Sequence, residues 1–162
     1  MLEIVTVNLS KLKPDKRNAR KHNDRNIAEI MRSIESFGQH RPFVVQRDTE
    51  KILIGNGMYT AMKKMGIKQA LVLYVDDDNE MAARRSIADN RTGELAEWDM
   101  DILREFVEKL GTSANIPGWN ENELESLCNL SPLPDVEPPH SEHAPKDEKL
   151  IKCPECGHEF TL

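Results

Sequence analysis

Short apolar runs alternate along the chain with segments in which apolar residues recur three or four positions apart. The short runs predict strands, and the longer spacing predicts helices with one buried face. The predicted strands cover residues 3–8, 42–47, 51–54 and 70–75. The predicted helices follow Asn23 or Asp24, Gly55, Asp78, Asp99 and Asn120. Their expected ends are Gly38, Gly66, Ala88, Gly111 and Asn129, and Asn120 with Glu123 has the spacing of a capping box.

The composition changes after residue 130. Residues 131–149 hold five prolines, two histidines and many charges, which predicts a mobile linker. Residues 150–162 then form a short separate unit. We therefore expect a first domain over residues 1–97, a helical extension over 98–130, a linker over 131–149 and a tail over 150–162.

The 162 residues are 38% hydrophobic, 31% charged and only 5% aromatic. No apolar run approaches the roughly 20 residues of a membrane span, and the start of the chain lacks the layout of a secretory signal. Three cysteines suit a reducing compartment better than a disulfide framework. These features predict a cytoplasmic protein with no membrane partner.

The net charge of −6 conceals an asymmetry. Up to Val75, fourteen Lys and Arg stand against seven Asp and Glu, and beyond it eight stand against twenty-one. The basic half favours a polyanionic partner such as DNA, and the alternative is that both halves carry solvated charges. The basic loop of residues 11–25 has no interleaved aromatics, which favours sequence-independent phosphate contact. The candidate DNA-binding residues are Lys11, Lys13, Lys16, Arg17, Arg20, Lys21 and Arg25.

Gly55-Asn56-Gly57 follows a predicted strand and opens a predicted helix. Glycines permit a tight turn and close approach of a ligand, and free N–H groups at a helix start favour an anion. The alternative is a turn that needs glycine only for its geometry. Arg41, at the start of a neighbouring strand, is placed to face the same cavity.

The tail contains Cys153-Pro-Glu-Cys156-Gly-His158, a spacing typical of a zinc knuckle. Structural zinc takes four ligands, so the two thiolates need partners. The candidates within one chain are His158, His143 and His140, of which His158 and His143 are the expected ligands. A second cysteine pair from another chain, in a homodimer that shares the ion, or a metal-free remnant of a knuckle are the alternatives.

The order of the segments resembles the N-terminal domain of ParB, in the ParB and sulfiredoxin superfamily. The matching segments are Ile30 to Val45, Ile54 to Gly66 and Ala88 to Arg91, in the family's order and at its spacing. The resemblance extends from Val7 to about Glu97. The continuation to Asp99 resembles the phage and mobile-element branch, whose members often accompany DNA methyltransferases.

This resemblance implies an α+β fold with a small mixed sheet flanked by helices, and a nucleotide phosphate site at the glycine turn. Partition proteins of the family bind cytidine triphosphate and sulfiredoxin-type relatives bind adenosine triphosphate. The implied cofactor is therefore a nucleoside triphosphate with Mg²⁺. The implied nucleotide-binding residues are Arg41, Gly55, Asn56, Gly57, Asn90 and Arg91.

The turn departs from the Gly-Glu-Arg-Arg pattern of partition proteins. Asn56 stands at the glutamate position, and Gly57 and Met58 stand at the two arginine positions. Because a thioether does not replace the forked donors of arginine, we expect weak or absent nucleotide affinity. The sequence also lacks a cysteine near the turn, which argues against sulfiredoxin chemistry.

Three other features have structural interpretations. Cys128 lies on the apolar face of a predicted helix, which indicates a core residue. Trp98 and Trp119 each precede a helix, and we expect both to pack the helical half against the sheet. Asp76-Asp77-Asp78 indicates a solvated turn in which Asp78 caps the next helix, rather than a metal site.

The leading hypothesis is a phage-type, ParB-like protein that binds DNA or assists a DNA methyltransferase or another DNA-processing protein in a bacterial cytoplasm. The second hypothesis is an enzyme, a nucleotide hydrolase or nuclease at the Gly55 turn, whose catalytic residues the sequence does not identify. The third is an interaction adaptor whose acidic helices, Asp99 to Asn129, dock a partner.

Overall fold

The computed structural model describes residues 3–129, 150–152 and 159–161. The chain divides into two compact units, Met1–Asn129 and Leu130–Leu162. In its described residues, the second unit is an antiparallel strand pair, β5 (Leu150–Lys152) and β6 (Glu159–Thr161), which the sequence pattern does not predict. The predicted linker lies outside the described residues.

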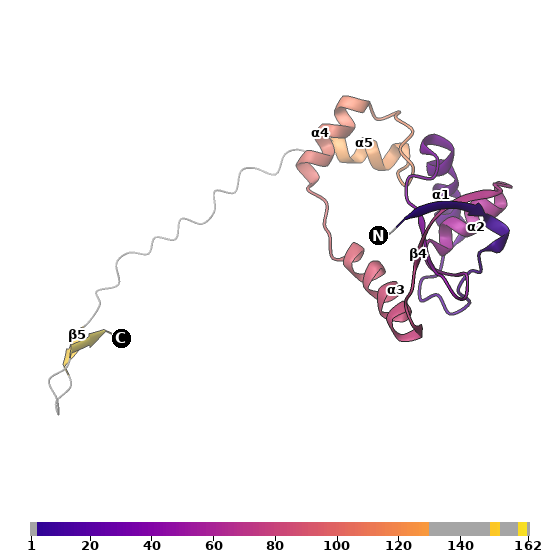
Figure 1. Ribbon diagram of the computed structural model, residues 1–162. Helices are drawn as coiled ribbons and strands as arrows, with labels where there is room; N and C mark the ends of the chain where they lie inside the picture. The colour runs from indigo at the N-terminus through magenta and orange to yellow at the C-terminus, as the bar shows by residue number, and fades with distance from the viewer. Residues whose placement is uncertain (1–2, 130–149, 153–158, 162) are drawn as a thin grey trace. The chain divides into compact units, whose positions relative to one another are not determined.

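The first unit alternates strands and helices in the predicted order (Figure 1). Its elements are β1 (Ile4–Asn8), a 3-10 turn (Leu9–Lys11), α1 (Asp24–Phe37), β2 (Phe43–Gln46), β3 (Lys51–Ile54), α2 (Asn56–Lys64), β4 (Gln69–Val75), α3 (Asn79–Glu94), α4 (Met100–Leu110) and α5 (Glu121–Asn129). The predicted α+β fold is therefore confirmed.

The four strands of this unit form one mixed sheet in the order β1-β4-β2-β3. β1 is antiparallel to β4, and β2 is antiparallel to β3. β2 and β4 are parallel, with Phe43 opposite Val72. Because β2 and β3 are antiparallel, with Val44 opposite Ile54, the end of β3 lies beside the start of β2. This pairing brings the Gly55 turn close to Arg41.

Alternate residues of the strands face two layers of helices. The larger core includes residues of α1 and α2 and consists of Leu9, Leu12, Ile27, Ile34, Phe43, Val45, Ile52, Ala61, Met62, Ala70 and Val72. A smaller cluster on the other face joins Leu53, Val75 and Ala82 of α3, with Val44 and Ile54 packed against it. Alternation along β2 places Phe43 and Val45 in one core and Val44 in the other.

The helices α4 and α5 have a small core of their own. Val107, Leu124 and Leu127 are buried there, and Trp119 and Cys128 pack against them. Cys128 is thus a packing residue, as predicted. Trp98, in contrast, is 67% exposed, and its ring lies edge-on to that of Trp119, with ring centroids 6.3 Å apart.

The prediction that Trp98 and Trp119 pack against the sheet is therefore wrong. Trp98 lies in the connection between α3 and α4, and Trp119 belongs to the separate core of the α4–α5 pair. Both positions precede a helix, as the sequence indicates. The sequence thus indicates where each tryptophan stands relative to a helix, but the arrangement of the helices determines what its ring contacts.

Polar contacts connect the α4–α5 pair to α1. The Gly118 N–H donates to the Glu29 carboxylate at 2.7 Å, and Arg25 pairs with Glu123 at 3.1 Å. The hydrogen bond from Gly118 lowers the pKa of Glu29. The backbone hydrogen bond from Asn120, followed by the side-chain bond from Arg25, lowers the pKa of Glu123. These contacts are strongest when both carboxyl groups are ionised.

The predicted helix caps are present. Asn23, rather than Asp24, caps α1, and Asp78 caps α3 by accepting the Met81 N–H at 2.8 Å. Asn120 and Glu123 form the reciprocal capping box, with both hydrogen bonds at 2.9 Å. α3 continues past the expected Ala88 to Glu94, so the glycine at position 93 does not end it.

Candidate phosphate site at the start of helix α2

Gly55 makes the turn from β3 into α2. Its φ of 109° is left-handed, and a Cβ at this position would lie 2.7 Å from Cδ1 of Phe43. Backbone conformation and packing therefore both require glycine. Among the described residues no side chain caps α2. The N–H groups of its first turn are thus available to an anion.

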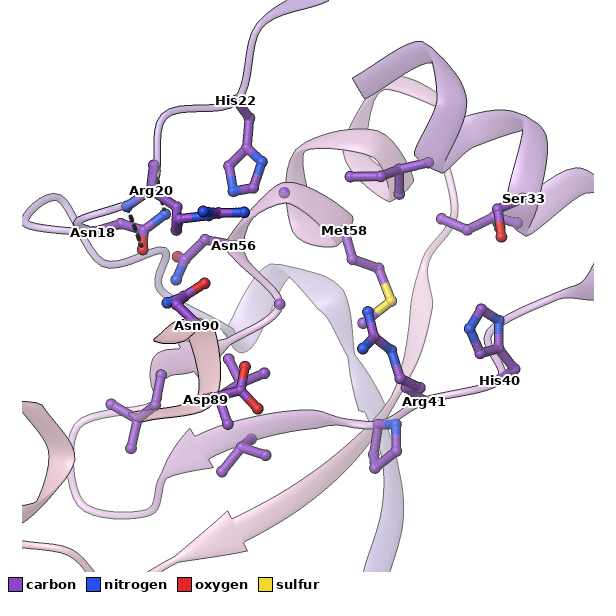
Figure 2. A pocket seen from close by; sticks show the side chains of 18 of the residues that line it. Asn18, Arg20, His22, Ser33, His40, Arg41, Asn56, Met58, Asp89 and Asn90 are labelled. Carbon is purple, nitrogen blue, oxygen red and sulfur yellow. Dashed lines mark hydrogen bonds between the residues drawn. The ribbon is translucent and has the colours of Figure 1, made fainter. Parts of the chain in front are cut away.

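A cavity of about 500 Å³ opens at this turn (Figure 2). That volume lies in the range of roughly 300–1,000 Å³ found for small-molecule sites. Its apolar wall is formed by Ile30, Ile34, Pro42, Val44, Leu53 and Ile54. Its polar and charged lining is formed by Asn18, Arg20, His22, Ser33, His40, Arg41, Asn56, Asp89 and Asn90.

Most of the predicted nucleotide-binding residues meet at this cavity. Those that line it are Arg41, Gly55, Asn56, Gly57 and Asn90. Arg91 does not line the cavity, and its guanidinium pairs with Glu94 at 3.5 Å. Position 91 lies one residue beyond Asn90 on α3, so its side chain leaves the helix in another direction.

The side chain of Asn56 is engaged with the protein. Its Oδ1 accepts the backbone N–H of Asp15 at 2.9 Å, and its Nδ2 donates to the Ile52 carbonyl at 3.3 Å. The residue therefore fastens the loop of residues 11–25 to the glycine turn. This role as a positioning residue differs from the expected role in direct phosphate contact.

The fastened loop brings Arg20 to the cavity. The Asn18 side chain donates to the Arg20 carbonyl at 2.9 Å, which shapes the loop at this point. The Arg20 guanidinium also pairs with Glu94 at the end of α3. Figure 2 shows Arg20 and His22 on the side of the cavity near Asn56. The loop thus supplies basic groups to a turn that has none of its own.

Arg41 approaches from another segment of the chain. The side chain of Gln39 donates to the Arg41 carbonyl at 3.0 Å and to the Leu71 carbonyl at 2.9 Å. It also accepts the Leu71 N–H at 2.8 Å. Gln39 thereby anchors the segment before β2 to β4. Figure 2 shows the Arg41 side chain extending toward Met58, with His40 beside it.

The α3 side of the cavity carries amide and acidic groups. Asn90 donates its Nδ2 to the Ser86 carbonyl at 2.8 Å. Asp89 is the one carboxylate among the lining residues, against Arg20 and Arg41. Arg20 and Arg41 outnumber it among the lining residues, although Arg20 is also paired with Glu94, which does not line the cavity. Arg41 and the available N–H groups at the start of α2 therefore favour an anionic ligand.

The sequence pattern missed the cavity roles of Arg20, His22 and His40. Arg20 lies in the basic loop and is grouped there with the DNA candidates. The contact that brings the loop to the turn joins Asp15 and Asn56, which are far apart in sequence. Clustered asparagines at 18, 23 and 26 were the available signal, because such side chains shape loops through backbone hydrogen bonds.

The DNA candidates fall into two groups. Arg20 and Arg25 pair with Glu94 and Glu123. The others are exposed and, within the described residues, take part in no salt bridge: Lys11, Lys13, Lys16, Arg17 and Lys21. The loop is anchored as well, because the Lys13 N–H donates to the Glu50 carbonyl at 2.8 Å.

The expected zinc ligands Cys153, Cys156, His158 and His143 lie outside the described residues. Within the described part of the chain, no group of three or more His, Cys, Asp or Glu side chains is arranged to hold a metal ion. No helix there is long and apolar enough to span a bilayer.

The fold is similar to that of a solved ParB structure, as the sequence resemblance predicts. No protein-family model matches the chain, and no curated protein matches it. Solved structures do. The C-terminally truncated chromosome-partitioning protein ParB from Caulobacter crescentus, complexed with CTP-gamma-S, aligns with a TM-score of 0.71 at 16% identity, over 82% of this chain and 81% of its own.

Two further structures are more distant. A pNOB8-like ParB N-domain aligns with a TM-score of 0.46 at 16% identity, over 99% of this chain and 54% of its own. Sulfiredoxin from Arabidopsis thaliana aligns with a TM-score of 0.44 at 23% identity, over 52% of this chain and 97% of its own. The similarity to the Caulobacter crescentus protein, at 16% identity, concerns the fold alone.

Proposed function

We propose that this chain is a ParB-like, DNA-associated protein whose cavity at the start of α2 binds the phosphates of a nucleotide. The observation that carries the proposal is the convergence of Arg20 and Arg41, from separate segments, on an uncapped helix start. Such a helix start attracts phosphate, and arginine is suited to its geometry. The apolar wall beside Val44 and Leu53 supplies a surface for the rest of the ligand.

This proposal departs from the expectation of weak nucleotide affinity. That expectation counts the cations of the turn alone, where Gly57 and Met58 provide none. Arg20 adds a guanidinium from the loop, which it shares with Glu94, to that of Arg41. The likeness to a ParB that was crystallised with CTP-gamma-S makes CTP the first candidate. Mg²⁺, which the family resemblance implies, belongs to the same proposal.

Calorimetry tests the proposal with CTP, ATP, GTP and UTP, each with Mg²⁺. We expect at least one to bind, and Arg41→Ala to weaken it about tenfold or more, since a charged donor to phosphate contributes about 1.5–3 kcal/mol. Arg84→Ala is the matched control, because Arg84 is exposed on α3 and pairs with Glu80. Absence of binding by all four nucleotides at 1 mM would contradict the proposal. Phosphate release in the same samples would support the enzyme hypothesis.

The exposed cations of the basic loop favour a second function, electrostatic contact with DNA. Lys16, Arg17 and Lys21 are exposed on a segment that the Asn56–Asp15 hydrogen bond holds in place. Each phosphate that such a side chain neutralises contributes about 0.9 to the slope of log K against log salt. The contact would therefore be tolerant of sequence and sensitive to salt.

Two double variants test this contact. Arg17→Gln with Lys21→Gln should flatten the salt slope by about 2, at about 0.9 for each lost phosphate contact. Arg84→Gln with Lys109→Gln removes the same charge from exposed helices and should leave the slope unchanged. Equal slopes for wild type and the loop variant would show that the loop is only solvated surface.

The finer parts of the sequence hypothesis belong to this proposal as well. They are a phage-type origin, a DNA methyltransferase or other DNA-processing partner, a homodimer, and a bacterial cytoplasmic location. The zinc knuckle formed by Cys153 and Cys156 also stays a prediction. Metal analysis of protein purified without chelator tests the knuckle, with Cys153→Ser as the comparison.

A further inference from the structure

The imidazole of His22 lies over Gly57 and adds a further side chain that can contact a ligand in the cavity. We propose that His22 contacts the bound phosphate and stands in for the side chain that position 57 lacks. This inference rests on the proposed function, because it names a recognition residue of the same cavity. The loop residue, rather than the helix residue, then completes the site.

The geometry at Gly57 is the first observation. Gly57 is buried in the first turn of α2 and has no positive φ, so its backbone conformation does not require glycine. A Cβ on Gly57 would lie 2.7 Å from Cε1, 2.8 Å from Nδ1 and 3.0 Å from Nε2 of His22. A side chain at position 57 therefore requires the His22 ring to move. The imidazole therefore occupies the space into which a side chain at position 57 would extend.

The anchoring of the ring is the second observation. His22 Nδ1 donates to Oδ1 of Asn26 at 2.7 Å, and the Asn26 N–H donates to the α1 cap residue Asn23 at 2.8 Å. The ring is thus fixed to the start of α1. Because Nδ1 is engaged, Nε2 is the nitrogen left for a ligand.

The surroundings of His22 are the third observation. His22 lines the cavity together with Arg20 and Asn56, and Figure 2 shows the three side chains on the same side of it. A phosphate at the start of α2 would therefore meet the helix N–H groups, the Arg20 guanidinium and the imidazole together. As an imidazolium, the ring donates Nε2–H to a phosphate oxygen. Asn56 and Asn26 hold the two ends of the arrangement through the contacts described above.

Calorimetry with CTP and with inorganic tripolyphosphate tests the inference. We expect His22→Ala and Gly57→Ala each to weaken binding of both probes about tenfold, which corresponds to about 1.4 kcal/mol. Gly57→Ala should do so by displacing the ring. The double variant, His22→Ala with Gly57→Ala, should bind no more weakly than whichever single variant binds more weakly. Both substitutions remove the same contact, so their effects should not add.

Two companion variants separate recognition from folding. His22→Ala with Gly57→Arg places a cation from the helix into the vacated space and should restore affinity to within about threefold of wild type. Gly57→Ala should keep or raise Tm, because alanine is the better helix former. Lower affinity without lower Tm is an outcome that a purely structural role does not give. Lys63→Ala, at the far end of α2, is the control for lost charge.

The outcomes distinguish the two proposals. Wild-type protein that binds neither tripolyphosphate nor any of the four nucleotides at 1 mM overturns the proposed function and this inference with it. Wild-type binding that His22→Ala retains within twofold overturns the inference and leaves the proposed function standing. If His22→Ala has a lower Tm, its lost binding could come from partial unfolding, and His22→Gln separates the two causes. Because His22→Gln keeps a polar side chain, it should still bind both probes, but more weakly than wild type.

Discussion

Two regions of the molecule bury apolar helix faces to different extents. They are the sheet region, which is the sheet with α1–α3, and the α4–α5 pair. The sheet region buries eleven apolar residues in its larger core, and the α4–α5 pair buries three. On α4, Ile102, Phe106 and Leu110 are all more than half exposed. The pair contacts α1 through Glu29 and through the Arg25–Glu123 ion pair. The difference shows that apolar packing stabilises the sheet region, whereas polar contacts place the helical extension.

Substitution of core residues should give the largest effect and separate the two regions. Phe43→Ala removes a fully buried ring and should lower the free energy of unfolding by about 3–5 kcal/mol. Leu124→Ala should instead loosen only α4 and α5. The sequence has two tryptophans, Trp98 and Trp119, so fluorescence reports the extension, whereas far-UV circular dichroism reports every helix and strand.

Urea titrations followed by both signals provide the test. Leu124→Ala should move the fluorescence transition to lower urea and leave most of the dichroism transition in place. Phe43→Ala should move both. Transitions that coincide for both variants would show one cooperative unit and would contradict the division into two differently stabilised regions.

Two left-handed glycines, one in each region, offer a smaller and sharper comparison. Gly55→Ala meets both an unfavourable φ and the Phe43 ring, and we expect a loss of about 2–3 kcal/mol. Gly111, at the end of α4, has φ 86° and ψ 146°, a conformation that favours glycine, but nothing lies within 4 Å of a Cβ, so Gly111→Ala should cost only the backbone strain of about 1–2 kcal/mol. Equal losses in thermal unfolding would mean that the Phe43 contact relaxes freely.

The third prediction concerns acid pH and should give the smallest effect, because both carboxyl groups are near the surface. The pKa values of Glu29 and Glu123 are lowered in the folded protein. Their contribution to stability is therefore present above the unfolded value of about 4.5 and is lost as the pH falls through the folded pKa. Between pH 6 and pH 3, the amide protection factors, which correct for the fall of intrinsic exchange with pH, should decrease in α4 and α5 before they decrease in the sheet.

Glu29→Gln is the matched variant for this test. It keeps an oxygen that can accept the Gly118 N–H but removes the charge, so the difference in protection factor between pH 6 and pH 3 should shrink. Uniform changes in protection factor across both regions would indicate that other carboxyl groups control the acid response.

Most of the fold could be predicted from local pattern. The strands and helices of residues 3–129 follow from apolar spacing, and their caps follow from Asn23, Asp78 and Asn120. The strand pair β5–β6 could not be predicted, because strands of three residues are too short to show an alternating apolar pattern. The contacts of Trp98 could not be predicted from the local sequence either, since they depend on where whole helices lie.

The candidate site divides in the same manner. The Gly55 turn was predictable because glycine between a strand and a helix is a local signal. The placement of Arg20 and His22 was not, because it depends on the hydrogen bond between Asp15 and Asn56. Composition assigned the loop a single electrostatic role, whereas the structure divides its cations between the cavity, an ion pair with the extension and the open surface.

The two glycines of the turn should have different evolutionary histories. Gly55 is fixed by its own backbone and by Phe43, so every descendant that keeps the fold should keep it. Gly57 has a helical backbone, and the three heavy atoms nearest to a Cβ there all belong to the ring of His22. Once a lineage loses that histidine, position 57 becomes free to acquire a side chain, and the two positions should therefore covary among related sequences.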